Sequence, residues 1–491
     1  MKNTMKKILC VVMCLSLVLA TGIVSAFAEG ENTISRVSCT INGDTKTQRG
    51  FCWYTTNASE SKIKICLGDE DVTDTLKITE KMNEEWEGNY VHQLTVSGLT
   101  AGAEYTYQVG DGDNWSNTGK FRTDDGDSKF SFISIGDVQA GSDENFRRAS
   151  LVLDAAFQTV PDAEFLANMG DHTNDSTNEE WDYYFSNFER INMNTSLAPA
   201  AGNHDGLGVW HWFENIFNLD ESEATQTLNG VNYSFDYGNA HFAVLNTNDL
   251  LSVTLAQMQW LKNDMNSSAA DWKIVFMHKS PYTLGKDGKW PDALYLTDVL
   301  VDIIDQCDVD LVMSGHDHMY LRTKPLTNNK VDEENGAVYV LGGTAGTKRY
   351  EVREFSADLY MKTKFIDAMT IQKSGYGNYW NGKDWNSTDE ANVGGVFDAI
   401  SIDGGTLTLN AYVLTEETQT TKLIDTFTLT KETGKAKPSF SGDNTTSLLD
   451  YILTFLPSFG NLAKYTLINW LPKTIIFLPK IIYYVIKTDT F

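Results

Sequence analysis

The chain shows two patterns of apolar and polar positions, one before and one after about residue 124. From residue 33 to about residue 124, short runs of alternating apolar and polar residues are separated by Gly, Asn and Asp, as at 50–54, 62–66 and 90–96. Alternation with a period of two predicts strands that bury one face. A succession of such strands with turn residues between them predicts an all-β sandwich over 33–124.

After a polar segment at 123–128, the pattern changes to strands that alternate with helices. This alternation is typical of an α/β fold, in which helices cover the faces of a sheet. We predict strands at 130–135, 164–169, 197–201, 241–247, 272–278 and 309–313, and within 394–414 and 422–429. We predict helices at 143–158, 178–190, 255–265 and 291–306. The second domain is therefore expected to extend over 128–432.

Several predicted strands in this second region are followed by a carboxylate, an amide or an imidazole. The segments are Gly136-Asp137, 170–174, 202–205, Met277-His278 and 315–318. Because open α/β sheets bind ligands at the carboxyl ends of their strands, these groups are expected to meet at one edge. In the last segment, His316 and His318 stand at alternate positions and point the same way. Such a pair by itself is only a weak indication of a metal site.

These five segments, in this order, resemble the motifs of the calcineurin-like metallophosphoesterases, and among them the purple acid phosphatases, which carry a fibronectin-like domain before the catalytic one. The resemblance extends from about residue 33 to about residue 430. It includes 94–109, which resembles a fibronectin type III segment with a tyrosine corner at Leu99 and Tyr105. The resemblance implies an α/β domain built as a four-layer α/β/β/α sandwich, preceded by an all-β fibronectin type III-like sandwich.

The resemblance also implies two metal ions that share one bridging aspartate. One metal would be held by Asp137, Asp171 and His318, and the other by Asp171, Asn203, His278 and His316. Two cations about 3.5–4 Å apart lower the pKa of a shared water molecule and hold phosphoryl oxygens during in-line attack. Imidazole, carboxylate and amide ligands without thiolate suit Fe, Zn or Mn. We therefore expect two divalent or mixed-valence metal ions as cofactors.

Asn174 departs from the family pattern, and we count it with the candidate metal-site residues. Purple acid phosphatases have a tyrosine at this position, three residues after the bridging aspartate, and its phenolate binds ferric iron and gives the colour. Because a neutral amide does not stabilise a trivalent ion as a phenolate does, we expect a colourless enzyme.

Gln139, two residues after Asp137, is expected either to complete the ligands of the first metal or to hydrogen-bond bound water.

By the same resemblance, His204 is not a ligand but a general acid that protonates the departing alkoxide. Asp205 would orient and charge the His204 ring. His211 lies where relatives carry a further histidine that contacts substrate, and the alternative is a place at the rim or in aromatic packing. His172, which follows the bridging aspartate, is expected near the site without binding metal.

The aromatic-rich stretch between residues 350 and 392 is longer than an ordinary connection. Long loops in compact domains are commonly lids or binding loops, so we expect either a lid or a loop packed on the sandwich.

The resemblance implies a metal-dependent phosphoric ester hydrolase, similar to the acid phosphatases, that acts on phosphate monoesters of small molecules. A phosphodiesterase or nucleotide pyrophosphatase is the nearest alternative, because the same metals attack diesters. An alternative from another class is a surface-binding protein whose phosphoesterase domain has lost its activity.

The ends and the charge of the chain bear on its location and partners. Three lysines and then an apolar run precede small residues, which predicts a signal peptide over 1–28, cleaved near Ala28, and hence a secreted or cell-surface protein. The net charge of −27 disfavours nucleic-acid binding.

The apolar extension at 440–491 is interrupted by lysines and prolines, and its runs are too short to span a bilayer. It is expected either to pack on the globular part or to contact a membrane peripherally.

Overall fold

The computed structural model describes residues 32–206, 212–221, 231–248, 256–283, 291–348, 350, 369–370, 378–380, 385–387, 393–415 and 419–434. The expected signal peptide, the C-terminal extension, His211 and most of the aromatic-rich stretch lie outside the described residues.

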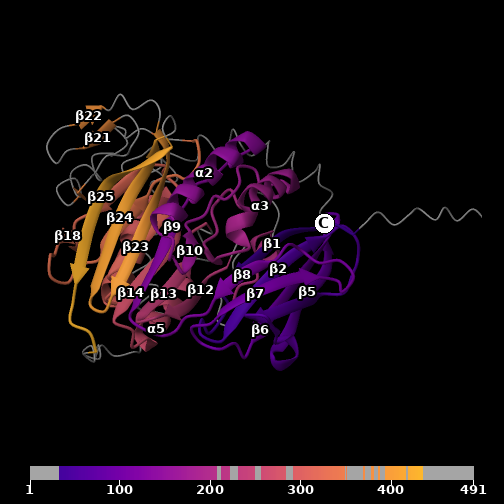
Figure 1. The fold of residues 1–491 in the computed structure, drawn as a ribbon. Coiled ribbons are helices and arrows are strands. Elements are labelled where there is room, and N and C mark those ends of the chain that lie inside the picture. The colour runs from indigo at the N-terminus through magenta and orange to yellow at the C-terminus, as the bar shows by residue number, and fades with distance from the viewer. Residues whose placement is uncertain are drawn as a thin grey trace, which may run out of the picture.

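The N-terminal region is a sandwich of two antiparallel sheets, drawn in indigo and purple in Figure 1. One sheet contains β1 (Ile34–Thr40), β2 (Gln48–Thr55), β6 (Asn89–Ser97) and β5 (Lys77–Trp86). The other contains β4 (Glu70–Asp71), β3 (Lys62–Leu67), β7 (Glu104–Gly110) and β8 (Gly119–Arg122), and a 3₁₀-helix at Thr73–Thr75 follows β4. Burial alternates along β3 and β7, so the apolar side chains of both sheets meet in one core.

The tyrosine corner is present in this sandwich. The backbone N–H of Thr100 donates a hydrogen bond of 2.9 Å to Tyr105 Oη, and Leu99 is buried in the same core. This contact fixes the turn before β7 to the strand itself. The all-β fold expected for the N-terminal region is confirmed.

The second region contains two mixed sheets packed face to face. The first sheet adds, to the strands of the N-terminal sheet, β11 (Ser196–Pro199), β10 (Phe165–Asn168), β9 (Lys129–Ile135), β23 (Val393–Asp403), β24 (Thr406–Thr415) and β25 (Thr420–Thr430), in that spatial order. The second sheet has the order β12 (Tyr233–Tyr237), β13 (Ala240–Leu245), β14 (Trp272–Lys279), β15 (Leu311–Gly315), β19 (Val338–Gly342), β16 (Tyr320–Thr323) and β20 (Met369–Thr370). Two small hairpins pair β17 (Leu326–Thr327) with β18 (Lys330–Val331) and β21 (Asn378–Trp380) with β22 (Trp385–Ser387).

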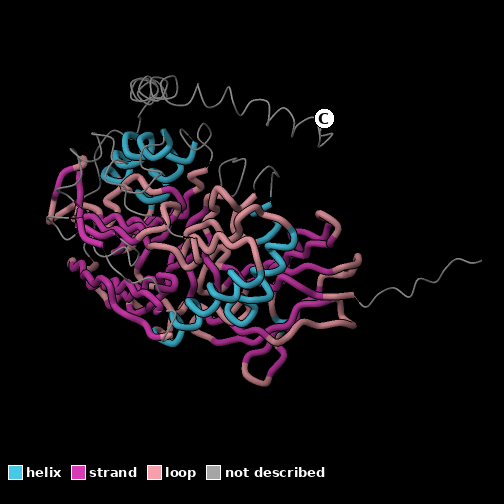
Figure 2. Tube along the Cα trace, turned by 90° about the horizontal axis from the view of Figure 1, so that it is seen from above, coloured by secondary structure: helices cyan, strands magenta, loops and turns pink. Residues whose placement is uncertain are grey.

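Helices cover the outer faces of both sheets, as Figures 1 and 2 show. α2 (Asp143–Thr159) and α3 (Asn178–Asn192) pack on the first sheet, whereas α5 (Met258–Ser267) and α6 (Pro291–Gln306) pack on the second. The short α4 (Trp212–Ile216) lies against the N-terminal sheet. The four-layer α/β/β/α arrangement is therefore confirmed. None of the helices in the described part of the chain is both long and apolar enough to cross a membrane.

The predicted elements of the second region occur in the structure with ends that shift by up to three residues. The stretch 394–414 is two strands, because a turn at Gly404 and Gly405 separates β23 from β24. The predictions missed β12, β16 and β19, and also the short strands β17, β18, β20, β21 and β22.

A capping box starts α3. Thr177 Oγ1 accepts from the backbone N–H of Glu180, and the Glu180 carboxylate accepts from the backbone N–H groups of Thr177 and Asp175. The cap therefore also fixes the segment that leads from β10 into the helix.

The two regions share one sheet, since β1 pairs in parallel with β11 at Thr40 and Leu197. Fully buried Arg49 strengthens the junction: its guanidinium donates to Ser196 Oγ at 2.9 Å and to the Arg122 carbonyl at 2.6 Å. The sandwich thus continues the first sheet of the second region.

The polar segment at 123–128, which connects the two regions, is also packed against its neighbours. Asp124 is buried and its carboxylate accepts hydrogen bonds from Thr45 Oγ1 and from the backbone N–H of Gly238, both at 3.1 Å. These bonds join the sandwich, the connection and the second sheet, so the connection does not act as a free hinge.

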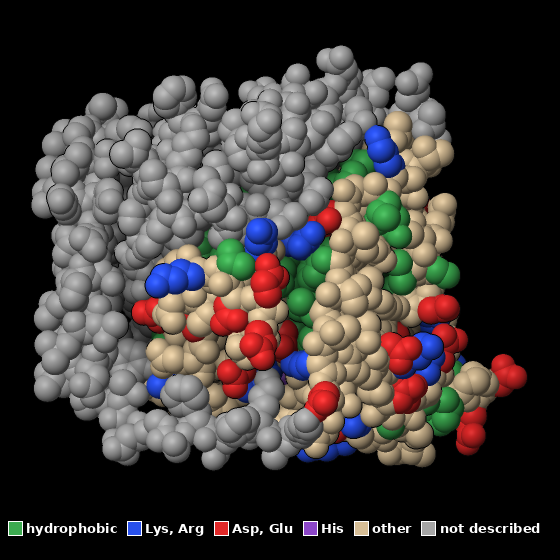
Figure 3. All heavy atoms as spheres, turned by 90° about the vertical axis from the view of Figure 1, so that its left-hand side faces the viewer, with side chains coloured by type: hydrophobic (Ala, Val, Ile, Leu, Met, Phe, Trp, Pro, Cys, Tyr) green, Lys and Arg blue, Asp and Glu red, His purple; other side chains and the backbone are tan. Residues whose placement is uncertain are grey.

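Surface charges of both signs lie close together. On the face in Figure 3, acidic side chains lie beside basic ones across the described surface. One ion pair, between Lys129 Nζ and Asp403 Oδ2, spans 3.5 Å, and both side chains are more than 70% exposed (75% and 71%). Exposed pairs of this kind contribute little to stability.

Asp398 on β23 is a buried acid without a hydrogen-bond partner among the described residues. Ser134, directly opposite it on β9, is also buried, and its hydroxyl is likewise unpaired there. Burial raises the pKa of Asp398 well above its usual value, and the charge of Asp425 raises it further. The folded protein therefore holds this carboxyl in its neutral form.

We expect Asp398→Asn to stabilise the metal-loaded protein, and to do so more at pH 7 than at pH 5. An unfolded aspartate ionises above about pH 3.9, whereas the folded one stays neutral, so wild-type stability falls as the pH rises by up to about 1.4 kcal/mol per pH unit. The difference in Tm between variant and wild type, measured at both pH values, tests this. Asp403→Asn is the exposed control; an Asp398→Asn effect that does not change with pH contradicts the assignment.

Candidate metal centre

The candidate residues lie where strands of the two sheets end. Asp137, 170–174 and 202–205 follow β9, β10 and β11, whereas His278 and 315–318 lie at the ends of β14 and β15. The strands run parallel within each sheet, so their carboxyl ends bring these loops to one edge. Acids and imidazoles from both sheets meet there in two groups that could each hold a metal ion.

The first ligand group consists of Asp137, Asp171 and His318, all buried, with ligand atoms within 4.8 Å of one another. His318 Nε2 lies 3.5 Å from Asp137 Oδ1. His318 Nδ1 lies 2.7 Å from the carbonyl oxygen of Lys348. Because a carbonyl only accepts, Nδ1 carries the proton and Nε2 presents its lone pair to the group.

The second ligand group consists of Asp171, His278 and His316, with the Asn203 amide beside it. His278 Nε2 lies 3.3 Å from Asp171 Oδ1, 3.0 Å from Asn203 Oδ1 and 3.2 Å from His316 Nδ1. His278 Nδ1 donates to the Met169 carbonyl at 2.7 Å, which leaves Nε2 for the site. Asp171 thus belongs to both groups.

The backbone of the site has a conformation that most residues avoid. Asp137, Gln139, Asp171, His316 and His318 all have positive φ, between 35° and 78°. Such a backbone costs on the order of 1–3 kcal/mol per residue and clusters at functional sites. These five positions therefore carry backbone strain of the kind that is common at functional sites.

Close approach of two loops explains the glycines that precede two of the candidate ligands. A Cβ at Gly202 would lie 2.0 Å from Asp171 N, and a Cβ at Gly170, whose φ is +92°, would lie 2.7 Å from Gly202 N. A side chain at either position would push the two loops apart. The Gly-Asp and Gly-Asn pairs in the sequence are therefore requirements of packing as well as of chemistry.

Burial dominates the electrostatics of the site. Burial raises the pKa of Asp137 well above its usual value, although the charge of His278 opposes it. Burial lowers the pKa of His316 well below its usual value and that of His318 to about 3. For His278, burial lowers the pKa, but the Asp171 and Asp137 carboxylates and the hydrogen bond to the Met169 carbonyl together outweigh burial and raise the pKa to about 9. His316 and His318 are therefore neutral, the form that binds metal.

The donor set fits a pair of divalent ions. It offers imidazole nitrogens with carboxylate and amide oxygens and no thiolate, which suits Zn, Fe or Mn. Gln139 Oε1 is buried and has no hydrogen-bond partner in the described part of the chain, while the Gln139 N–H donates to the Asp171 carbonyl at 2.8 Å. A buried oxygen without a partner is costly, and an ion or its water within reach would satisfy it.

The structure corrects the expected role of Asp205. Its carboxylate accepts hydrogen bonds from the backbone N–H groups of Gly202 (2.9 Å) and His172 (2.7 Å) and from His172 Nδ1 (2.8 Å). Within the described residues it makes no hydrogen bond to His204. Asp205 therefore joins the loop after β11 to the loop after β10 instead of orienting the His204 ring.

His204 is held by other contacts. Its backbone N–H donates to Asp171 Oδ1 at 2.8 Å, and its ring Nδ1 lies 2.5 Å from the Asn174 carbonyl oxygen. The carbonyl accepts, so Nδ1 carries a proton and the other ring nitrogen, Nε2, is the one left for chemistry. His204 is only half-buried, unlike His278 and His318.

Asn174 contacts the site through its backbone. Besides the His204 contact, its N–H donates to the Ala140 carbonyl at 3.2 Å. No hydrogen bond of the described residues joins its side-chain amide to either ligand group, so its place as a metal ligand stays a prediction. The role of His211 also stays a prediction, since His211 lies outside the described residues, next to buried Trp212.

Two further motif residues have contacts that the sequence did not indicate. His172 is fully buried and its ring lies against Trp181 and Tyr184. Asp317 is buried and accepts a hydrogen bond from Thr283 Oγ1. Thr283 precedes Asp317 by 34 residues, so no local pattern indicates this contact.

Comparison with known families agrees with this geometry. Residues 130–320 match the calcineurin-like phosphoesterase family, and residues 34–123 match the N-terminal domain of purple acid phosphatases. The chain therefore contains a calcineurin-like phosphoesterase domain, preceded by a domain similar to the N-terminal domain of purple acid phosphatases. The region that matches the phosphoesterase family contains all three strand-end segments of the first sheet and both histidine segments of the second.

Relatives of the chain include an uncharacterised protein of Mycobacterium tuberculosis, which is 26% identical over 34% of this chain and 39% of that protein. Purple acid phosphatase 15 of Arabidopsis thaliana is 25% identical over 36% of this chain and 34% of that protein. Human acid phosphatase type 7 is 24% identical over 52% of this chain and 64% of that protein. The chain thus spans about two fifths or less of the length of the first two relatives.

Two solved structures have a similar fold. A purple acid phosphatase, PPD1, from yellow lupin seeds superposes with a TM-score of 0.61 at 15% identity, over 85% of this chain and 78% of that chain. PhoD superposes with a TM-score of 0.53 at 11% identity, over 87% of this chain and 97% of that chain. At these identities the likeness concerns the fold.

We expect His278→Gln to reduce the metal content from about two ions per chain to about one, because the second ligand group loses the imidazole that lies 3.0 Å from Asn203 Oδ1 and 3.3 Å from Asp171 Oδ1. Mass spectrometry of metals after loading with Mn or Zn and dialysis measures this. His92→Gln, a buried histidine of the sandwich that stacks on Trp53, is the control and keeps both ions. Equal metal content in wild type and His278→Gln contradicts the ligand assignment.

Proposed function

We propose that the protein is an exported phosphoesterase with two metal ions that hydrolyses phosphate monoesters of small molecules. The observation that carries the proposal is that Asp171 belongs to two adjacent groups of buried ligands. A shared carboxylate between two such groups is the arrangement that two-metal phosphoesterases need.

The proposed metals would bind at defined residues. Asp137, Asp171 and His318 would hold the first ion, and the second ligand group with Asn203 would hold the other. When bound, such ions provide Lewis-acid stabilisation of phosphoryl oxygens and lower the pKa of water. Fe, Zn and Mn are the candidates, and the amide at Asn174 favours a colourless form.

His204 supplies the proton in this proposal. Its Nδ1–H is fixed on the Asn174 carbonyl and its backbone N–H on Asp171, so the ring is held next to the shared carboxylate. From the protonated ring, Nε2 donates to the leaving oxygen, a transfer of the kind that contributes about 10²–10⁴-fold to rate. A monoester with an alkoxide leaving group depends most on this step.

Export and surface contact rest on sequence alone. The basic and apolar leader at 1–28 supports secretion. Peripheral membrane contact through 440–491 would use its lysines and aromatic residues. Both segments lie outside the described residues.

The choice between monoester and diester hydrolysis can be tested with two chromogenic substrates. We expect kcat/KM of the Mn- or Zn-loaded protein to be at least about tenfold higher for nitrophenyl phosphate than for bis(nitrophenyl) phosphate, because a monoester exposes more phosphoryl oxygens to the two cations. A preference for the diester indicates a phosphodiesterase. The absence of hydrolysis with every metal contradicts the proposed function as a whole.

We expect His204→Gln to reduce kcat/KM by about 10²–10⁴-fold on an alkyl phosphate and far less on nitrophenyl phosphate, because nitrophenolate leaves without a proton. Asp205→Asn is the matched control. It loosens the loops without touching His204, so its loss should be similar on both substrates. The account of His204 is wrong if the two substrates respond equally to His204→Gln.

A further inference from the structure

A groove apart from the metal centre lies between α3, the start of β1 and the loop that follows β7. It measures about 900 Å³, within the ~300–1,000 Å³ range of pockets that bind small organic molecules. Amide and hydroxyl side chains predominate in its described lining, and none of the lining residues belongs to the two metal-ligand groups. The size and polarity of the groove suit an organic ligand that hydrogen-bonds, rather than a single ion.

Trp115 gives the groove an aromatic surface. It is 38% exposed, and no other tryptophan in the described part of the chain is as exposed. Its indole Nε1 donates to the Gly112 carbonyl at 3.1 Å, which fixes the orientation of the ring. The indole N–H is therefore already used, and the ring offers the groove a flat apolar surface for stacking.

The loop that carries Trp115 is ordered by its own contacts. Asp111 Oδ1 accepts a hydrogen bond of 2.7 Å from the backbone N–H of Asn114. Farther along the loop, Asn117 Nδ2 donates to Glu189 Oε1 on α3 at 2.9 Å, which joins two walls of the groove. A groove whose walls are already held in place loses little conformational entropy when a ligand binds.

Arg36 on β1 brings a hydrogen-bond donor that is not satisfied. It lies where the register between β1 and β2 shifts, and its φ of 52° is uncommon for a residue other than glycine. Its Nε donates to Asp182 Oδ1 and its Nη2 to the Asn178 carbonyl, both at 2.8 Å. Its Nη1 is buried and has no hydrogen-bond partner among the described residues. Because a buried N–H without a partner is costly, a ligand oxygen within reach of Nη1 would satisfy it.

The charges of the groove disfavour an anionic ligand. Its described lining contains the carboxylates of Asp113, Asp182 and Glu189 and the guanidinium of Arg36, which already pairs with Asp182. Neither the Asp113 carboxylate nor the Asn89 amide makes a hydrogen bond to another described residue. An amide both donates and accepts, and a carboxylate accepts, so these groups match hydroxyl groups on a ligand.

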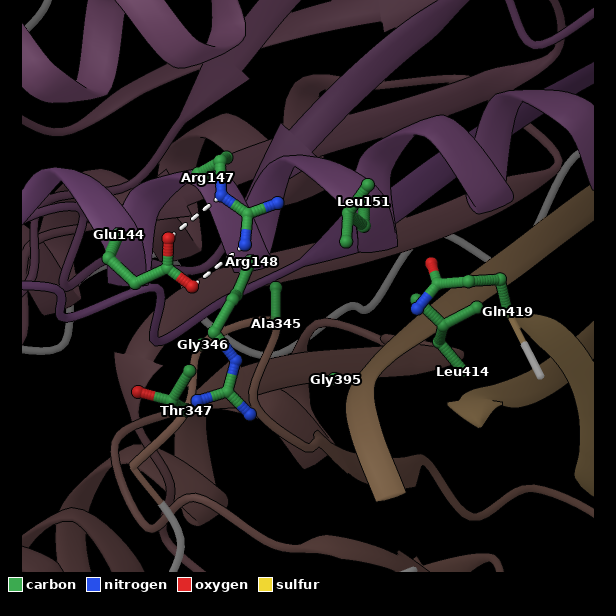
Figure 4. A pocket seen from close by; sticks show the side chains of 10 residues that line it. All are labelled: Glu144, Arg147, Arg148, Leu151, Ala345, Gly346, Thr347, Gly395, Leu414 and Gln419. Atoms are coloured by element: carbon green, nitrogen blue, oxygen red, sulfur yellow. Dashed lines mark hydrogen bonds and ion pairs between the residues drawn. The ribbon is translucent and has the colours of Figure 1, made fainter. Parts of the chain in front are cut away.

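A second pocket, between α2 and residues 345–347, lacks these features (Figure 4). It measures about 210 Å³, and no aromatic residue belongs to its described lining. Glu144 and Arg147 on α2 pair with each other there through two bonds of 2.8 and 2.7 Å, so these two charges compensate each other. This pocket therefore offers no surface for stacking.

We propose that the groove beside Trp115 binds an uncharged saccharide. Trp115 stacks on the apolar face of a sugar ring, and Asn89, Asp113 and Arg36 form hydrogen bonds with its hydroxyl groups. A sugar ring carries C–H groups on its faces and hydroxyl groups around its edge, which matches an indole ring beside amides and carboxylates. The site requires neither the metal ions nor the proposed hydrolysis, and it would attach the protein to a polysaccharide.

Calorimetric titration of the metal-loaded protein with four soluble oligosaccharides tests the site: cellopentaose, N-acetylchitopentaose, mannopentaose and xylopentaose. We expect at least one of them to bind the wild type with a Kd below about 1 mM. Tri-galacturonate, an acidic saccharide, should not bind, because the carboxylates of the groove repel it. If none of the four uncharged saccharides binds, or if spermidine binds in their place, the proposal is wrong.

Variants then place the binding in this groove. Trp115→Ala should weaken the affinity for the bound saccharide at least about tenfold, Trp115→Phe should weaken it less, and Asn89→Ala should weaken it about two- to tenfold, as expected for one hydrogen bond. Leu67→Ala removes an equally exposed apolar side chain of the sandwich outside the groove (39% exposed) and should leave the affinity unchanged.

The Tm of each variant shows whether it is folded, so the binding results do not depend on hydrolysis. If Trp115→Ala does not fold, Asn89→Ala decides. Saccharide binding of wild-type affinity in a folded Trp115→Ala, or in Asn89→Ala where that variant decides, overturns the proposal. A loss of saccharide binding without any hydrolysis in the wild type supports the groove and contradicts only the proposed function.

Discussion

The burial of two carboxylates beside each other, Asp137 and Asp171, is the constraint on which the site depends. Like charges in a medium of low dielectric repel strongly, so neighbours must supply hydrogen bonds or positive charge. The backbone N–H of His316 lies 2.9 Å from both oxygens of Asp137, and that of His204 lies 2.8 Å from Asp171. Two cations would supply the remaining charge, which explains why such a strained and costly cluster is arranged between two sheets.

The rest of the fold holds the loops that carry these groups. Asp205 joins the loops after β10 and β11, and Glu180 at the start of α3 fixes the segment between β10 and that helix. Arg49 and the β1–β11 pairing make the N-terminal sandwich an extension of the sheet that delivers Asp137 and Asp171. The sandwich thus supports the site structurally, although it contributes no ligand to either group.

Local patterns predicted the all-β and α/β regions, because alternating apolar positions determine the strands. They also predicted that polar groups at strand ends, such as His278 and His316, would meet at one sheet edge. The four-layer arrangement and the assignment of each ligand to a metal came from the family resemblance, and the assignment stays a prediction. The partner of Asp205 could not be predicted in this way. Its neighbour in sequence is His204, but the path of two loops brings it to His172. The sheet shared by β1 and β11 was missed for the same reason, since it joins strands far apart in the chain.

Anomalous diffraction from a crystal of the Mn- or Zn-loaded protein tests the central claim most directly, because it locates each ion relative to Asp171. The account predicts two anomalous peaks about 3.5–4 Å apart, both within bonding distance of the Asp171 carboxylate, with His318 on one and His278 on the other. A single peak, or two peaks that do not share Asp171, would contradict it.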